Sequence, residues 1–412
     1  MRARAIATLL IAVALSGSLI AFAAPSAPRP VPPAPESVVA KVAAVTASSK
    51  VDRSVAAALR GFDPLSNRLE GELYVSDLPD GRRAELTLDA RLQAAATKVL
   101  RDYEVPYGAL VAIEPSTGRV LAYVSYSSAN PDAGDLARDP SPPAASVFKV
   151  VTGSALIDRG IGPGQRVCYS GGAHRLLERD LADDPAHDKS CATLTEALGG
   201  SINSIFAKLA DRSLPDGTLE RYADAFGFGH ALPFDAPTRP SPAEVPTDRL
   251  ERARTAAGFW HMHMSPLHGA LIAATLANGG AMPRPAMVRR VLDAQGKPLY
   301  SHAPSTFRSV VSHATARTIG HMMTETVAHG TSRSAFHDPK GQPFLPGITV
   351  AGKTGSLSSE SPYRAYSWFI GFAPEDKPRI ALAALVVNTP KWRIKSSYLA
   401  REALRNYLMR KP

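Results

Sequence analysis

Ser146 and Lys149 lie three residues apart in the stretch 144–151, which we expect to begin a helix. Three residues make nearly one helical turn, so the hydroxyl and the amine should share one face of that helix. Pro142 and Pro143 stop any earlier helix and place Ser146 near the helix N-terminus, where backbone N–H groups favour developing negative charge. A hydroxyl beside an amine at such a position could act as an acyl-transfer nucleophile.

Two later stretches supply further groups of the same chemistry. The serine-lysine spacing alone occurs by chance in many chains of this length, and an ordinary buried helix start would explain it equally well. Ser201 and Asn203 add a second hydroxyl and an amide, and Lys353 begins a strand-like Lys-Thr-Gly stretch flanked by glycines. Together the three stretches hold the hydroxyl, amine and amide groups that acyl transfer requires.

In this order the three stretches resemble the Ser-x-x-Lys, Ser-x-Asn and Lys-Thr-Gly motifs of penicillin-recognising serine enzymes. The resemblance is to the transpeptidase domain of penicillin-binding proteins, because the likeness extends well beyond the motifs. Further stretches that fall where this family has them are 86–93, 108–122, 265–267, 277–280, 330–331 and 368–374. The resemblance implies a class B-like serine D,D-transpeptidase of the β-lactamase-like superfamily.

The chemistry of Ser146 needs a base, and the sequence has no histidine at triad-like spacing. Lys149 is the nearest base, but an ordinary lysine is protonated at neutral pH. We therefore expect its pKa to be lowered by burial and by the charge of Lys353. Ser201 is expected to relay the proton to the leaving nitrogen. The resemblance implies that the backbone N–H groups of Ser146 and Ser356 form the oxyanion hole, although many relatives have threonine at the second position.

The resemblance also implies a mode of substrate binding. The amide of Asn203 would bond the substrate backbone, and Lys353 and Thr354 would face its carboxylate. The strand that begins with Lys353 would pair with the substrate as an added β-strand. Gly355 would let the two backbones approach closely, because it has no Cβ.

The fold class expected from these patterns is α+β, with one antiparallel sheet assembled from distant parts of the chain. Two strand pairs are predicted around turn-forming residues, and two helices are predicted from helical spacing of apolar residues. The strands are 108–113 with 120–125 and 366–373 with 380–387, and the helices follow Asp89 and cover 395–410. The resemblance adds a helical subdomain from about residue 150 to residue 329, with the active site between it and the sheet.

The N-terminal region has the features of an exported protein. A short basic start precedes an apolar run and a small-residue site at 21–23, which predicts a signal peptide or an uncleaved signal anchor. The protein would be anchored in the cytoplasmic membrane facing the periplasm, or be periplasmic if cleaved. The expected division is residues 1–24 as signal peptide or anchor, 25–60 as a Pro/Ala-rich linker, 61–84 as a short extension and 85–412 as the transpeptidase domain.

The formal net charge of +10 is most simply a solvated basic surface, and it also suits an anionic cell-wall polymer or lipid surface. No nucleic-acid motif accompanies it, so we expect no nucleic-acid partner. The resemblance implies peptidoglycan stem peptides ending in D-Ala-D-Ala as substrates and β-lactams as covalent inhibitors. It leaves contacts with other wall-synthesis proteins open, and no cofactor is expected.

Cys168 and Cys191 are the two cysteines of the chain. In an oxidising compartment such a pair favours a disulfide over two free thiols, and the alternative is two small buried apolar residues. The histidines at 261, 263 and 268 lack an accompanying ligand pattern, so we expect surface or core histidines and no metal site. The aspartates at 180, 183, 184 and 188 are expected to form a solvated acidic loop, and Glu325 is expected to be solvated as well.

Four functions remain open at this stage, with a peptidoglycan D,D-transpeptidase as the leading one. A D-Ala-D-Ala carboxypeptidase would use the same acyl-enzyme with water as acceptor. A β-lactamase is disfavoured, because no glutamate four residues before an asparagine follows the second motif. A β-lactam sensor or inactive scaffold is disfavoured by the intact motifs and by the lack of a recognisable signalling domain. The absence of an identifiable hydrolytic base favours an amine acceptor over water.

Overall fold

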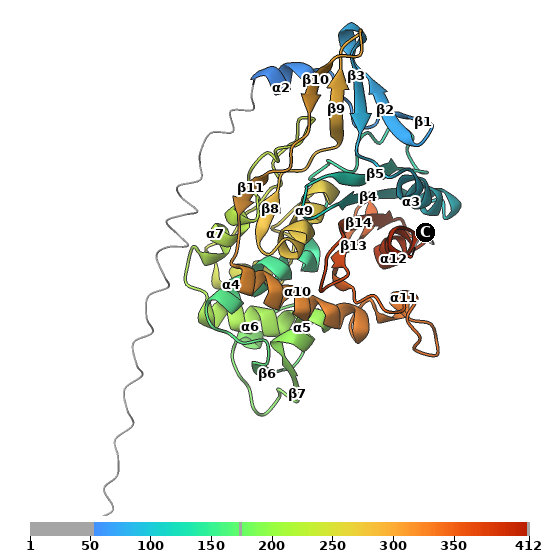
Figure 1. Ribbon diagram of the computed structural model, residues 1–412. Helices are drawn as coiled ribbons and strands as arrows, with labels where there is room; N and C mark the ends of the chain where they lie inside the picture. Colours follow the sequence, from blue (N-terminus) through green and yellow to red (C-terminus); the bar gives the residue numbers. More distant parts are fainter. Residues whose placement is uncertain (1–52, 173–174, 410–412) are drawn as a thin grey trace, which may run out of the picture.

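A five-stranded antiparallel sheet forms the centre of the molecule in the computed structural model, which describes residues 53–172 and 175–409 (Figure 1). Its strands come from both ends of the chain, as the sequence predicts. In spatial order they are β12 (Ala351–Glu360), β13 (Tyr363–Ala373), β14 (Ile380–Asn388), β4 (Tyr107–Ile113) and β5 (Val120–Tyr126). The sheet therefore has β12, the strand with the Lys-Thr-Gly motif, as one free edge.

Alternate residues of β14 supply two separate cores, because successive side chains of a strand point to opposite faces. Ala383 and Leu385 join the larger core, which lies between the sheet and the helical layer. Leu382 and Ala384 join the smaller core, which lies under α3 (Ala90–Asp102) and α12 (Ser396–Leu408). Both helices were predicted, and Asp89 caps α3 as expected by accepting a hydrogen bond from Leu92 N at 2.9 Å.

Helix α9 (Pro266–Ala277) is the central support of the larger core. It is apolar on all sides and almost wholly buried, as expected for a helix packed between a sheet and other helices. It contacts β14, β13 and β4 on one side and α10 on another. Ser265 caps its start by accepting a hydrogen bond from His268 N at 3.2 Å. The cap and the proline at its first position fix where this helix begins.

The predicted helical subdomain is present, but residues 281–309 within it form strands. Besides α9, its helices are α4 (Lys149–Asp158), α5 (Leu194–Gly200), α6 (Asn203–Ser213), α7 (Thr218–Ala225), α8 (Arg249–Ala256) and α10 (His313–Ala328), and α11 (Arg333–Phe336) follows. The strands are β8 (Ala281–Pro283), β9 (Val288–Leu292), β10 (Pro298–Ser301) and β11 (Thr306–Ser309). The expectation of a helical subdomain is therefore corrected over this segment.

A second five-stranded sheet joins the N-terminal extension to that segment. Its order is β1 (Arg68–Glu70), β2 (Leu73–Asp77), β3 (Arg83–Leu86), β9 and β10, and it forms the upper part of Figure 1 beside α2 (Arg53–Ala58). An ion pair between Glu85 and Arg290 links β3 to β9. The predicted boundary between residues 84 and 85 thus falls inside β3, so the extension is continuous with a sheet that includes residues from the expected catalytic domain.

Cys168 and Cys191 form a disulfide between β6 (Arg166–Tyr169) and β7 (Ser190–Thr193), where they face each other directly. Lys208 on α6 is buried behind this hairpin and forms an ion pair with Asp188, whose side chain is only 6% exposed. The expectation of a solvated acidic loop is therefore wrong for Asp188, because the carboxylate compensates a buried ammonium. Asp183, by contrast, is largely exposed.

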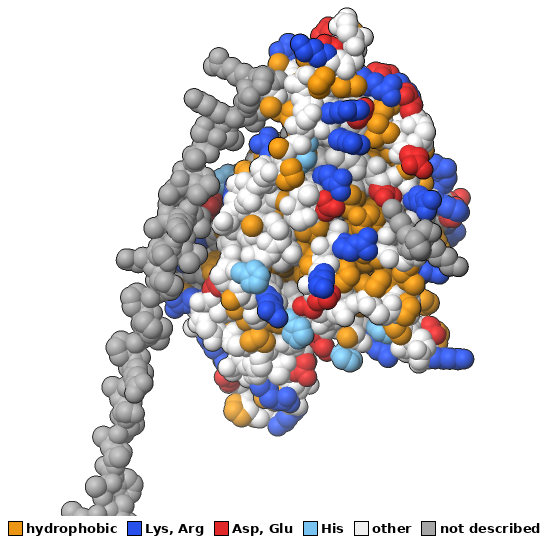
Figure 2. Space-filling view, viewed as in Figure 1, with side chains coloured by type: hydrophobic (Ala, Val, Ile, Leu, Met, Phe, Trp, Pro, Cys, Tyr) orange, Lys and Arg blue, Asp and Glu red, His pale blue; other side chains and the backbone are white. Residues whose placement is uncertain are grey.

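Charged side chains are mixed in sign over much of the surface. On the face shown in Figure 2, Lys and Arg are interspersed with Asp and Glu. Within residues 53–172 and 175–409, no helix combines the length and the apolar character needed to cross a bilayer. The predicted signal peptide or anchor at 1–24, and the linker up to residue 52, lie outside the described residues.

Candidate active site

Ser146 lies in the short 3-10 helix η2 (Ala145–Phe148), which leads directly into α4. The predicted helix start is therefore correct in position, although its first turn is wound more tightly than an α-helix. Ala145 has a φ of 52°, a left-handed conformation that is uncommon for a residue with a Cβ. Two hydrogen bonds hold the chain just before Ala145. Trp368 Nε1 donates to Pro143 O at 2.8 Å, and Ala144 N donates to Met262 O. Such strain, held by its surroundings, is typical of functional sites.

Lys149 is fully buried beside Ser146. Its Nζ lies 2.8 Å from Ser146 Oγ and 2.6 Å from Asn203 Oδ1, and it also contacts the carbonyl oxygen of Ala257. Burial, and then the charge of Lys353, hold the pKa of Lys149 well below its usual range. A neutral amine has two N–H groups and one lone pair. The two N–H groups match the acceptors Asn203 Oδ1 and Ala257 O, and the lone pair is left for the Ser146 hydroxyl, whose proton it can receive.

Lys353 forms a second buried amine site with Ser201. Its Nζ lies 2.9 Å from Ser201 Oγ and 2.8 Å from Thr354 O, and burial lowers the pKa of Lys353 to about 7. Ser201 follows the end of α5 with a φ of 57°, which turns its hydroxyl towards this lysine. Thr354 Oγ1 lies 2.5 Å from the hydroxyl of Thr331, in the loop after α10. The structure thus places Ser201 beside Lys353, while Asn203 contacts Lys149.

The edge strand β12 runs past the start of η2. A Cβ on Gly355 would lie 3.2 Å from Ala144 O and 3.3 Å from a methyl group of Val147, so only glycine permits this approach without displacement. Beside it, a cleft of about 570 Å³ contains Ser146, Asn203 and Ser356 in its wall. A volume of this size is in the range of small-molecule and peptide sites.

Aromatic side chains line the rest of this cleft, and the sequence patterns did not indicate them. They are Phe259, Trp260, Tyr363, Tyr366 and Trp392. Trp260 and Trp392 are 44% and 46% exposed, which is unusual for residues of this size. The signal available in the sequence was limited to Trp392, which stands between Lys391 and Arg393, because Trp260 follows Phe259 in a mixed stretch.

The other candidate residues of the sequence have structural partners. His268 is buried and its ring bridges Ser241 Oγ at 2.7 Å and Phe226 O at 2.9 Å. His261 contacts Glu251 at 2.9 Å. Glu325, predicted to be solvated, is partly buried and contacts His329. Within the part of the chain that is described, no three His, Cys, Asp or Glu side chains are grouped as a metal site would require.

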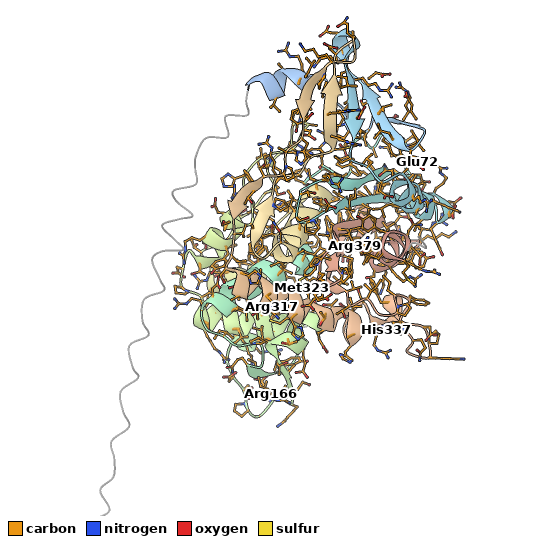
Figure 3. The ribbon with its side chains drawn as sticks, viewed as in Figure 1. Glu72, Arg166, Arg317, Met323, His337 and Arg379 are labelled. Atoms are coloured by element: carbon orange, nitrogen blue, oxygen red, sulfur yellow. A yellow bond between two sulfur atoms is a disulfide. The ribbon has the colours of Figure 1, made fainter. Side chains whose placement is uncertain are left out.

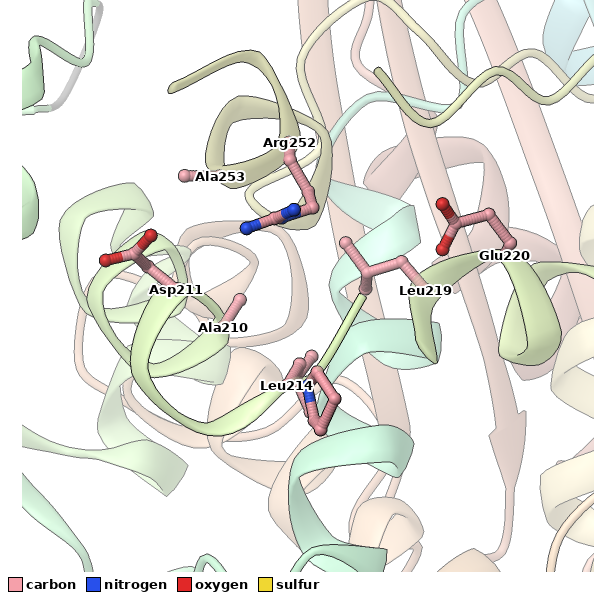
Figure 4. Close-up of a pocket in the computed structure, with 8 residues that line it drawn as sticks. Ala210, Asp211, Leu214, Leu219, Glu220, Arg252 and Ala253 are labelled. Carbon is pink, nitrogen blue, oxygen red and sulfur yellow. The ribbon is translucent and has the colours of Figure 1, made fainter. Parts of the chain in front are cut away.

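A separate pocket between α6, α7 and α8 is too small for a substrate. Asp211, Leu219, Glu220 and Arg252 are among its lining residues (Figure 4). It encloses about 10 Å³, roughly the minimum for one water molecule. The cleft beside Ser146 is therefore the better candidate for the functional site.

Comparison with known proteins finds a matching family model and similar relatives. Residues 108–409 match the family described as the penicillin binding protein transpeptidase domain. The chain is 28% identical over 383 residues to the peptidoglycan D,D-transpeptidase PbpA of Mycobacterium tuberculosis H37Rv, covering 83% of this chain and 74% of that protein. The peptidoglycan D,D-transpeptidase MrdA of Haemophilus influenzae is 23% identical, with 80% and 56% covered.

Solved structures give the same result. The crystal structure of PBPA from Mycobacterium tuberculosis superimposes with a TM-score of 0.65 at 25% identity, covering 79% of this chain and 82% of that one. The penicillin G acyl-enzyme complex of penicillin-binding protein A from the same organism superimposes with a TM-score of 0.61, also at 25% identity, covering 79% and 80%.

Proposed function

Because the chain belongs to the penicillin binding protein transpeptidase family, we propose that it is a peptidoglycan D,D-transpeptidase that works through an acyl-enzyme at Ser146. The observation that carries this proposal is the contact of a buried, low-pKa Lys149 with the Ser146 hydroxyl at 2.8 Å. The hydroxyl faces a cleft large enough for a peptide. Two similar relatives are named peptidoglycan D,D-transpeptidases, which supports the same substrate class.

In the first step Ser146 Oγ attacks the carbonyl carbon of the penultimate D-Ala, and its proton passes to Lys149 Nζ. The new C–O bond converts the carbonyl oxygen into an oxyanion. We propose that the backbone N–H groups of Ser146 and Ser356 bind this oxyanion, because both residues line the cleft at the point where β12 passes η2. Asn203 Oδ1 and Ala257 O hold the resulting ammonium in place.

In the second step the C–N bond breaks and D-alanine leaves with a proton on its nitrogen. Ser201 is the proposed donor of this proton. Its hydroxyl lies 2.9 Å from Lys353 Nζ, which can supply a proton to the hydroxyl in turn. The pKa of about 7 for Lys353 suits proton exchange at neutral pH. Lys353 and Thr354 are the proposed partners of the substrate carboxylate, and Gly355 leaves room for the substrate backbone along the edge of β12.

The acyl-enzyme is then transferred to an amine of a neighbouring stem peptide, which forms the cross-link and restores the Ser146 hydroxyl. The test is to supply a donor ending in D-Ala-D-Ala with and without an amine acceptor. We expect slow D-alanine release with the donor alone and a cross-linked product when the acceptor is added. Fast release with no cross-linked product would make the protein a carboxypeptidase.

We also propose that the protein is exported and faces the periplasm, where D-Ala-D-Ala stem peptides and β-lactams would reach the cleft. The support is the short basic start followed by apolar residues and the small-residue site at 21–23. Fractionation followed by N-terminal sequencing distinguishes the two forms. A membrane-bound protein that begins at Met1 is anchored, and a soluble periplasmic protein that begins near residue 24 has been cleaved. Cytoplasmic protein with an intact N-terminus would contradict export.

A further inference from the structure

The hairpin of β6 and β7 lies against the two helices that carry the Ser-x-Asn motif. It is below α5 and α6 in Figure 1, and Arg166, labelled in Figure 3, is the first residue of β6. Strand β7 ends at Thr193, which is also the N-cap of α5. Helix α5 is followed by Ser201, and α6 begins at Asn203. Strand β7 is therefore joined through the chain to the turn that carries Ser201 and Asn203.

Strand β6, the other side of the hairpin, is bonded to α6 at two points. Ser204 Oγ donates a hydrogen bond to Gly171 O at 2.9 Å, just after β6 ends. Lys208 Nζ donates to Cys168 O at 3.0 Å, within β6. Ser204 and Lys208 lie on the same face of α6, since they are one helical turn apart, and both are only 1% exposed. Because Ser204 directly follows Asn203, its contact with Gly171 holds the beginning of α6.

The packing at Ser204 is close. Gly172 has a φ of +75°, and an added Cβ would lie 2.0 Å from Ser204 Oγ and 3.1 Å from Ser204 Cβ. The backbone that follows β6 therefore rests directly on the Ser204 side chain. A movement of β6 would reach the first turn of α6 through this contact.

The turn between α5 and α6 holds the partners of two buried amines. At the start of α6, Asn203 Oδ1 lies 2.6 Å from Lys149 Nζ. At the end of α5, Ser201 Oγ lies 2.9 Å from Lys353 Nζ. A shift of this turn would change the contacts of both lysines, and a displacement of about 1 Å at reacting groups costs about 100-fold in rate.

The disulfide closes a ring around this turn. From Cys191 the ring runs through α5, the turn and the start of α6, crosses to β6 at Ser204 and Lys208, and returns from Cys168 through the Sγ–Sγ bond. Without that bond, β6 and β7 retain a ladder of four residue pairs and the contacts of Lys208 with Cys168 O and Asp188. A two-stranded hairpin is only marginally stable by itself. Breaking the disulfide should therefore let β6 shift relative to β7.

We propose that Ser204 is a positioning residue that transmits the closure of the disulfide to the turn between α5 and α6, so that Ser146 is acylated faster in the oxidised protein than in the reduced one. This inference rests on the proposed acyl-enzyme and adds to it a dependence on redox state. A dithiol reduces the Sγ–Sγ bond with two electrons and two protons, which gives two thiols, and the dithiol becomes a cyclic disulfide. The loss of one well-formed hydrogen bond changes a population by about tenfold, which sets the expected size of the effect.

The test measures acylation by benzylpenicillin in stopped flow, for the oxidised protein and after reduction with dithiothreitol, with thiol titration to confirm each state. We expect the reduced protein to react about tenfold more slowly and reoxidation to restore the rate. Oxidised Ser204→Ala should also be about tenfold slower, and reduction should change its rate little, because the contact that transmits the shift is already lost.

The matched control is Ser154→Ala. Ser154 is a buried serine whose hydroxyl donates to Val150 O at 2.9 Å, within α4 and away from the hairpin. This variant removes a hydrogen bond of the same length, and it should acylate and respond to reduction as the unsubstituted protein does. Circular dichroism checks that each form is folded at the assay temperature.

Several outcomes overturn this inference alone. One is an equal rate for the oxidised and the reduced protein while both are folded. Another is an oxidised Ser204→Ala that reacts at the unsubstituted rate, or that reduction slows as much as it slows the unsubstituted protein. If reduction unfolds the protein, the oxidised variants decide, and equal rates for Ser204→Ala and Ser154→Ala overturn the inference. If the oxidised, unsubstituted protein is not acylated at Ser146, the proposed function fails together with it.

Discussion

Gly258 packs against the backbone of Ser146, the proposed nucleophile, and replacing it with alanine should displace Ser146 without changing any reacting group. Its φ is +85°, and an added Cβ would lie 2.4 Å from Ala145 O and 2.9 Å from Ser146 Cα. Carbon atoms and their non-bonded neighbours normally stay about 3.5 Å apart. The segment containing Ser146 must therefore move by about 1 Å to accept the methyl group.

The substitution should lower both the stability of the fold and the rate of acylation, and the two losses have separate causes. A left-handed backbone costs an alanine roughly 1–2 kcal/mol, and overpacking adds roughly 1–3 kcal/mol, so the stability should fall by about 2–5 kcal/mol. A displacement of about 1 Å at a reacting atom costs about 100-fold in rate. We therefore expect Gly258→Ala to acylate with benzylpenicillin about 100-fold more slowly than the unsubstituted protein, at a temperature where both are folded.

Gly229→Ala is the matched control. Gly229 also has a positive φ, of +76°, but an added Cβ would meet no atom within 4 Å. This variant should lose only the roughly 1–2 kcal/mol of backbone strain and keep its acylation rate. The assay is stopped-flow acylation together with thermal unfolding. Equal acylation rates for the two variants would show that contact between residue 258 and the Ser146 backbone does not position the nucleophile.

Three other perturbations have defined outcomes. Lys149→Ala should slow acylation by about 10²–10⁴-fold, because it removes the proposed base, and a normal rate would refute that assignment. Burial lowers the pKa of His268 from 6.5 to about 4, so the unfolded chain binds a proton more readily than the folded one. This difference contributes up to about 3 kcal/mol to the free energy of unfolding above pH 6.5, and the contribution is lost as the pH falls to 4. His268→Gln should flatten that dependence in urea unfolding, and an unchanged pH profile would contradict it. Asp188→Ala should destabilise the fold by about 3 kcal/mol by leaving Lys208 buried without its main counter-ion, whereas Asp183→Ala, at an exposed site, should cost under 1 kcal/mol.

The sequence predicts those parts of the fold that depend on neighbouring residues. The cap at Asp89 and the helix after it follow from local spacing, and so does the hairpin of β4 and β5. The position of Ser146 and Lys149 at a helix start is local in the same sense, because prolines precede it. Each of these features is decided within about a dozen residues, so a pattern in the chain reports it directly.

The sequence does not predict what depends on distant contacts. The pairing of β3 with β9 joins Glu85 to Arg290 across 205 positions, and no local signal marks either strand as the partner of the other. The aromatic lining of the cleft also depends on distant contacts, since Trp260 and Trp392 line the same cleft only in the fold. The partner of Ser201 also required the structure, because its left-handed backbone turns the hydroxyl to Lys353.

The most direct test of the central claim is to identify the residue that benzylpenicillin acylates. The protein is incubated with the drug, its intact mass is measured, and the modified peptide is sequenced by mass spectrometry. We predict one added penicilloyl group, located on Ser146, and none in folded Ser146→Ala. A label on another residue, a label that persists in Ser146→Ala, or no label on the folded protein would contradict the assignment of Ser146 as the nucleophile.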